Sequence, residues 1–134
     1  MFFKIKERLC GKDISKLKDS TLVKSIGDYF GEDFSSVKFK TGSILPFIVP
    51  FPYSAIVFGE TVYIRDGYES VLCDPHVMAE ELFHVIQWRR LGWTRLPFIY
   101  IFNHLRWGYH KNPIEREAKS MAEKFMKFKT GVEK

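Results

Sequence analysis

The spacing of apolar residues predicts that the chain begins with a helix over residues 13–30. Leu22 and Ile26 recur at helical spacing within it, which places them on one face. Ser20 is a suitable cap for its second part, and Gly31 is a typical residue just after a helix end. We therefore expect one N-terminal helix with an apolar face.

Alternation of apolar and polar residues then predicts strands. Residues 35–42 alternate in this way, and residues 54–65 contain two short apolar runs around Gly59-Glu60, a hairpin signal. The apolar run 44–58 holds three prolines and is too short and too broken to be a membrane-spanning helix. We expect it to form buried loop and strand.

Three further helices follow the strands. Two of them open on a cap residue followed by proline, at Asp74-Pro75 and at Asn112-Pro113. The expected bounds are 75 to about 91 with a stop at Gly92, from after Pro97 to near Gly108, and 113 to about 130.

Length and composition complete the picture of the fold. The 134 residues, 46% of them hydrophobic, fit a single domain over residues 1–134, with 1–12 as an N-terminal extension and a core over about 13–130. The predicted class is α+β, with an N-terminal helix, a small antiparallel sheet and a C-terminal helical part.

Charge and cysteine usage limit which binding partners and which cellular compartment we expect. The formal net charge is +5, but no dense basic run or nucleic-acid-binding motif occurs, so we expect no nucleic-acid partner. Cys10 and Cys73 lie far apart, and no signal peptide or transmembrane segment is evident, so we expect a cytoplasmic protein.

The aromatic-rich stretch 93–108 is most simply a cover for the preceding helix; the alternative is peripheral membrane contact.

The chemistry of the sequence centres on MAEELFHVIQW, residues 78–88, which resembles an H-E-x-x-H helix with Glu80 in place of the first histidine. Residues four apart share a helix face, so Glu80 and His84 can reach one metal ion. In the H-E-x-x-H arrangement the second-position glutamate, here Glu81, acts as general base instead of binding the metal.

A catalytic zinc site needs a third protein ligand, and NPIEREAKSMA, residues 112–122, is its best source. Glu115 is the favoured ligand and Glu117 the alternative. An apolar helix that carries two adjacent carboxylates needs compensation for their burial, which a metal would supply. Salt bridges from Arg89, Arg90 or Lys119 are the structural alternative.

Three other residues are candidates for the same site. His76 lies one turn before Glu80 and is a possible alternative ligand, although a surface histidine is the simpler interpretation. His110 and Tyr109 are possible donors to a substrate or transition state.

Together, AEELFHVIQ and NPIEREA, preceded by FGEDFSSVKFKTG and YIRDGY, resemble the zincin-like peptidase domain of core proteins of extracellular contractile injection systems. The resemblance implies a zincin-like fold and zinc-dependent hydrolysis of a peptide bond. It implies that His84 is the second metal-ligand histidine, Glu81 the general base and Glu115 the acidic third ligand. Glu80 departs from the family pattern.

Two hypotheses follow from that departure. A Glu-His-Glu set still suits Zn²⁺ but tilts towards Mn²⁺ or Fe²⁺, and its negative charge makes the ion a weaker Lewis acid. The first hypothesis is an altered metallopeptidase acting on a peptide or protein that the sequence does not identify. The second is a catalytically inactive relative that serves as an interaction or structural module.

Overall fold

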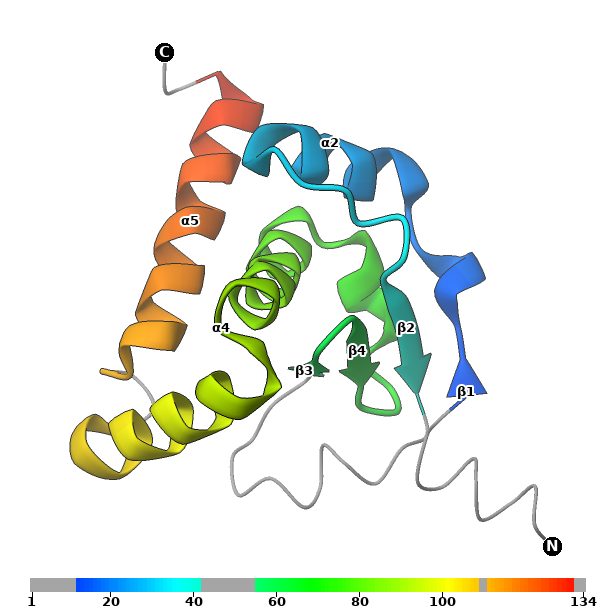
Figure 1. The fold of residues 1–134 in the computed structure, drawn as a ribbon. Helices are drawn as coiled ribbons and strands as arrows, with labels where there is room; N and C mark the ends of the chain where they lie inside the picture. Colours follow the sequence, from blue (N-terminus) through cyan, green and yellow to red (C-terminus); the bar gives the residue numbers. More distant parts are fainter. Residues whose placement is uncertain (1–11, 42–54, 109–110, 132–134) are drawn as a thin grey trace, which may run out of the picture.

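A computed structural model describes residues 12–41, 55–108 and 111–131 and gives an α+β arrangement (Figure 1). The first segment of helix α4 lies between α5 and a small sheet, and α2 crosses near the far end of α5 (Figure 1). In chain order the elements are β1 (Lys12–Asp13), the 3₁₀ turn η1 (Ser15–Leu17), α2 (Ser20–Phe30), β2 (Lys38–Thr41), β3 (Ala55–Phe58), β4 (Thr61–Ile64), the 3₁₀ turn η2 (Glu69–Cys73), α4 (Pro75–Trp107) and α5 (Pro113–Thr130).

The sheet is mixed, with strand order β1-β2-β4-β3, so the prediction of an antiparallel sheet is wrong. The predicted hairpin is present as the antiparallel pair β3–β4, but β2 pairs with β4 in parallel. Both hairpin strands alternate in the same way, so the pattern could not show which of them would lie beside β2. Phe39, Val62 and Val57 are aligned across the three longer strands and buried, which makes one face of the sheet part of the core.

The N-terminal helix is shorter than predicted, because α2 begins only at Ser20 and the cap is Asp19. The Asp19 side chain accepts a hydrogen bond from the backbone N–H of Leu22 at 3.1 Å. Before it, the backbone N–H of Ile14 donates to the carbonyl of Phe39 at 2.7 Å, so pairing with β2 replaces helix there. The predicted end at Gly31 is confirmed by its left-handed conformation (φ 71°).

Helix α4 is broken at Gly92, as predicted, by a non-helical conformation (φ 81°, ψ 173°). The second segment starts directly after Gly92, so the expected start after Pro97 is wrong by about one turn. The Trp88 and Trp93 rings, 4.6 Å apart, flank the break, and the Trp88 indole N–H donates to the Val57 carbonyl at 3.0 Å. Two aromatic rings thus fix the break against the sheet.

Helix α5 starts and ends as its sequence signals predicted. The Asn112 side chain accepts a hydrogen bond from the Ile114 N–H at 3.0 Å, and Gly131 is left-handed. Ala118 and Ala122 are fully buried, which allows α5 to approach α4 closely. Among the described residues, no helix combines the length and hydropathy needed to cross a bilayer.

Candidate metal centre

Three side chains of metal-ligand type converge where the start of α5 meets the first segment of α4. Glu80 and His84 come from successive turns of α4, and Glu115 comes from the first turn of α5. One potential ligand atom from each lies within 4.8 Å of the others. Within the described part of the chain no other such group was found. The three residues that the sequence indicated as ligands therefore lie close together.

His84 and Glu115 already interact across the two helices. The His84 Nε2 and Glu115 Oε2 atoms are 3.3 Å apart, and Glu115 is only 5% exposed. A buried carboxylate needs partners, and the Tyr100 side chain supplies another hydrogen bond to Glu115. Tyr100 was not among the residues predicted from the sequence, although its spacing from buried Leu96, one helical turn earlier, places it on the inward face of α4.

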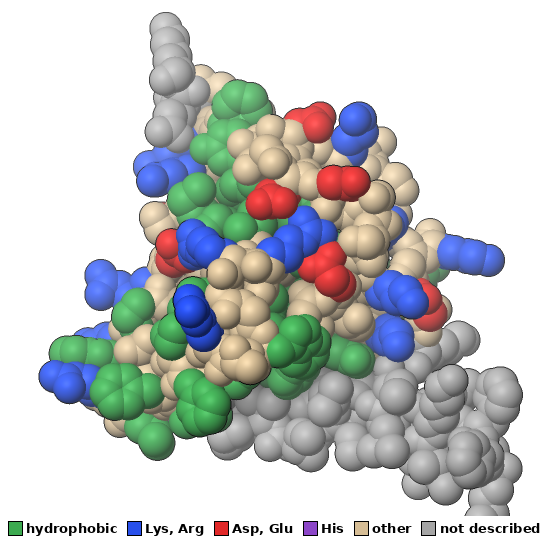
Figure 2. Space-filling view, in the orientation of Figure 1, with side chains coloured by type: hydrophobic (Ala, Val, Ile, Leu, Met, Phe, Trp, Pro, Cys, Tyr) green, Lys and Arg blue, Asp and Glu red, His purple; other side chains and the backbone are tan. Residues whose placement is uncertain are grey.

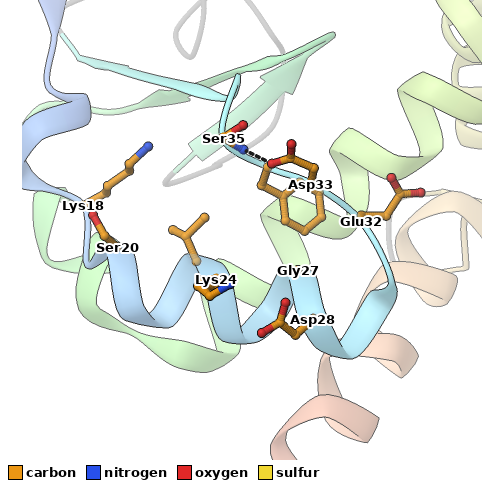
Figure 3. A pocket seen from close by; sticks show the side chains of 10 residues that line it. Lys18, Ser20, Lys24, Gly27, Asp28, Glu32, Asp33 and Ser35 are labelled. Atoms are coloured by element: carbon orange, nitrogen blue, oxygen red, sulfur yellow. Dashed lines mark hydrogen bonds between the residues drawn. The ribbon is translucent and has the colours of Figure 1, made fainter.

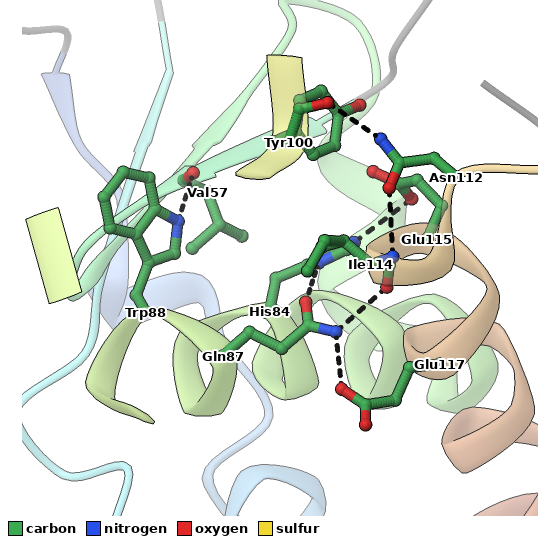
Figure 4. Close-up of polar contacts among 9 residues, drawn as sticks. All are labelled: Val57, His84, Gln87, Trp88, Tyr100, Asn112, Ile114, Glu115 and Glu117. Atoms are coloured by element: carbon green, nitrogen blue, oxygen red, sulfur yellow. Dashed lines mark hydrogen bonds and ion pairs between the residues drawn. The ribbon is translucent and has the colours of Figure 1, made fainter. Parts of the chain in front are cut away.

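Gln87 determines which ring nitrogen of His84 faces the site (Figure 4). Its amide nitrogen donates to the Ile114 carbonyl at 2.9 Å and to a Glu117 carboxylate oxygen at 3.0 Å. Both amide hydrogens are therefore directed to acceptors, so the amide oxygen, 2.7 Å from His84 Nδ1, accepts a hydrogen bond from that nitrogen. With its hydrogen on Nδ1, neutral His84 presents an unprotonated Nε2 towards Glu115.

The alternative candidates lie outside this group. Glu117 accepts from Gln87 and also forms a 2.6 Å ion pair with Arg90, so it is held away from His84. His76 lowers the pKa of Glu80 through its charge but does not join the converging atoms. Tyr109 and His110 lie outside the described residues.

Burial raises the pKa of both carboxyl groups on α4. For Glu80 the main cause is desolvation, with the Glu115 charge adding to it and His84 opposing it. For Glu81 desolvation dominates, and the charges of Glu80 and Glu115 help to raise its pKa to about 7. A carboxyl group with this pKa exchanges a proton readily near neutrality.

In the His84–Glu115 pair, by contrast, the pKa shifts favour the charged form of each residue. Burial disfavours both charged forms, but the hydrogen bond and charge of Glu115 outweigh it and raise the pKa of His84 to about 9. For the same reason His84 holds the pKa of Glu115 below its usual range despite burial. In the metal-free protein at neutral pH the pair is therefore an imidazolium and a carboxylate.

Arg89 and Arg90 on α4 do not neutralise the site, and Arg90 is paired with Glu117. Arg89 instead forms ion pairs with Glu60 at 2.6 Å and Glu32 at 3.2 Å. Lys119 lowers the pKa of Glu80 and Glu115 through its charge, but as a minor contribution. Of the three salt-bridge partners considered from the sequence, only Lys119 therefore acts on the site.

A separate hollow of about 570 Å³ lies beside α2, away from the metal-type group (Figure 3). Charges of both signs border it, including Lys18, Lys24, Asp28 and Asp33. Asp33 is engaged there in accepting a hydrogen bond from the Ser35 N–H at 2.8 Å. The hollow contains none of the candidate site residues.

In comparisons with known proteins, no family model, curated protein or solved structure matches the chain. The resemblance to the zincin-like family therefore remains a prediction from sequence motifs.

We expect Gln87→Met to weaken both the fold and the site. Methionine fills a similar volume but leaves the buried Ile114 carbonyl and the His84 Nδ1–H without partners, at a cost of about 1–3 kcal/mol in the free energy of unfolding. Loss of ligand orientation should lower metal affinity by about tenfold or more. Urea denaturation and metal titration measure the two effects.

Arg90→Gln is the matched control for this substitution. It removes the exposed ion pair to the same Glu117 and should change unfolding by less than about 1 kcal/mol. A Gln87→Met protein as stable as Arg90→Gln and unchanged in metal affinity would contradict the orienting role of Gln87.

Proposed function

We propose that Glu80, His84 and Glu115 bind a divalent transition-metal ion and that the protein is a zincin-like metallopeptidase with an altered first ligand. The proposal is supported chiefly by one observation: ligand atoms of these three residues, from two helices, lie within 4.8 Å of one another. The sequence motifs on both helices favour the same assignment.

The donor set suits such an ion. Two carboxylates and one imidazole nitrogen are compatible with Zn²⁺ and also with Mn²⁺ or Fe²⁺. Gln87 holds His84 in the tautomer that directs Nε2 to the carboxylates. The raised pKa of Glu80 reflects an energetic cost of ionisation in this place, which a cation between the carboxylates would relieve.

The residues of the site would then have separate chemical roles. When bound, the ion would act as a Lewis acid that polarises a peptide carbonyl and lowers the pKa of water. Glu81 is next to Glu80 and within electrostatic range of His84 and Glu115, and its pKa in the metal-free chain is about 7, so its carboxyl group can exchange a proton near neutral pH. Its carboxylate accepts a proton from the attacking water and returns it to the leaving amine. His84 and Glu115 hold the ion rather than transfer protons.

A second candidate function is supported by the satisfaction of the site without metal. The ion pair between His84 and Glu115, with hydrogen bonds from Tyr100 and to Gln87, already compensates the buried charges of these two residues. A catalytically inactive member of the fold could therefore keep these residues for stability and act as an interaction or structural module. The glutamate at position 80 favours this candidate.

Metal content separates the two candidates. Protein purified without a histidine tag and incubated with zinc or manganese should hold about one ion per chain. His84→Ala should lose it, because the central nitrogen ligand is removed. His76→Ala, on the same helix but outside the converging group, should retain it. Elemental analysis after gel filtration measures the content; an equal, negligible content in all three proteins would favour the inactive module.

Glu81→Gln tests the reaction separately from the metal. The amide keeps the size of the side chain but cannot accept the proton, so hydrolysis of a denatured protein substrate should fall by about a hundredfold or more. The metal content should stay unchanged, because Glu81 is not among the converging ligands. Full activity in this variant would exclude Glu81 as the base, even if metal binding stands.

A further inference from the structure

The second segment of α4, residues 93–107, exposes a row of large apolar side chains. Phe98 is 78% exposed, Ile101 57%, Phe102 62% and Leu105 81%. At 100° per residue these four positions fall within an arc of about 100°. They form one continuous stripe, which we call the apolar face. Soluble surfaces rarely carry such a row without a partner.

The opposite side of the same segment already has a structural role. Leu96 is 4% exposed and packs in the core, and the Tyr100 side chain reaches Glu115. The inward side therefore accounts for the packing of the segment onto the domain. The apolar face cannot be explained as core.

The charged side chains on the stretch of sequence that carries the apolar face are all basic. Between Glu81 and Glu115 the sequence contains no acidic residue, whereas it contains basic ones at Arg89, Arg90, Arg95, Arg106 and Lys111. Arg89 and Arg90 are engaged in ion pairs on the body of the domain. Figure 2 shows hydrophobic side chains gathered over this part of the molecule with basic side chains beside them.

Arg95 and Arg106 lie along one edge of the apolar face, about 20° apart around the helix. Both are exposed, and the Arg106 guanidinium lies 5.0 Å from the centre of the Trp107 ring. Arginine beside exposed aromatic residues is typical of segments that lie at the interface between lipid headgroups and acyl chains.

We propose that the second segment of α4 binds an anionic membrane surface, lying in its plane. Phe98, Ile101, Phe102 and Leu105 enter the boundary between headgroups and acyl chains, and Arg95 and Arg106 contact lipid phosphates. Anionic lipid complements a segment without acidic residues, whereas a second copy would bring two basic surfaces together. The helix does not need to cross the bilayer to do this.

If the proposal holds, the candidate metal centre lies near the membrane. Membrane binding itself does not require a bound metal ion. The segment that carries the apolar face also carries Tyr100 on its other side, next to Glu115. One helix, about 10 Å across, would separate the two. A membrane-bound chain would thus hold the metal centre close to material at the membrane surface.

Flotation of the full chain with vesicles tests the proposal. The protein should float with phosphatidylcholine vesicles that contain about a quarter phosphatidylserine and not with phosphatidylcholine alone. Phe98→Ser/Phe102→Ser should lower the partition coefficient onto these vesicles by about a hundredfold, because two aromatic side chains no longer enter the lipid. Arg95→Gln/Arg106→Gln should lower it by about tenfold or more at low salt.

Leu17→Ser is the matched control, because Leu17 is a similarly exposed apolar residue (61%) on η1, outside the apolar face. It should float like the unaltered chain, and circular dichroism verifies that every variant is folded.

Failure to float with anionic vesicles would overturn the proposal, and so would equal binding to neutral vesicles. Self-association that Phe98→Ser/Phe102→Ser abolishes, without any vesicle binding, would assign the apolar face to a second copy instead. Flotation is independent of metal content, so a metal-free protein that floats would support the membrane proposal alone.

Discussion

The buried amide of Gln87 joins the two helices on which the candidate site depends. It is fully buried and connects His84 on α4 to the Ile114 carbonyl at the start of α5. Because both its donor hydrogens and its acceptor oxygen are used, the amide can satisfy its partners in only one orientation. The packing of α4 on α5 and the tautomer of His84 are therefore set by the same side chain.

Burial of charge is the second constraint on the site. Two glutamates on an otherwise apolar helix face lose solvation, and their pKa values rise in consequence. Arg89 and Arg90 form ion pairs elsewhere, so compensation comes from His84 and, less strongly, from Lys119. A protonated histidine and a divalent cation are alternative ways to compensate the same negative charge. The structure thus accommodates either a metal-free form or a metal-bound one.

Local sequence signals predicted the helices and the convergence of the site, because these depend on short-range chemistry. Asp74, Asn112 and the glycines at helix ends act within one turn, and Glu80 and His84 share a face by spacing alone. The parallel pairing of β2 with β4 and the replacement of helix around Ile14 by pairing with β2 depend on tertiary contacts, which short-range patterns do not encode. Tyr100 was missed for the same reason, since its partner lies on another helix.

The claim that the converging residues are metal ligands can be tested by measuring the protons released when a metal ion binds. In the metal-free protein the raised pKa of about 9 keeps His84 protonated, and an ion can bind Nε2 only when that proton leaves. Metal affinity should therefore increase as the pH rises towards 9. The most direct measurement is a calorimetric zinc titration near pH 8 in buffers of different ionisation enthalpy. Release of about one proton per bound ion, absent in His84→Ala, is the predicted result. Zinc binding without proton release, or no binding by the unaltered chain, would contradict the account.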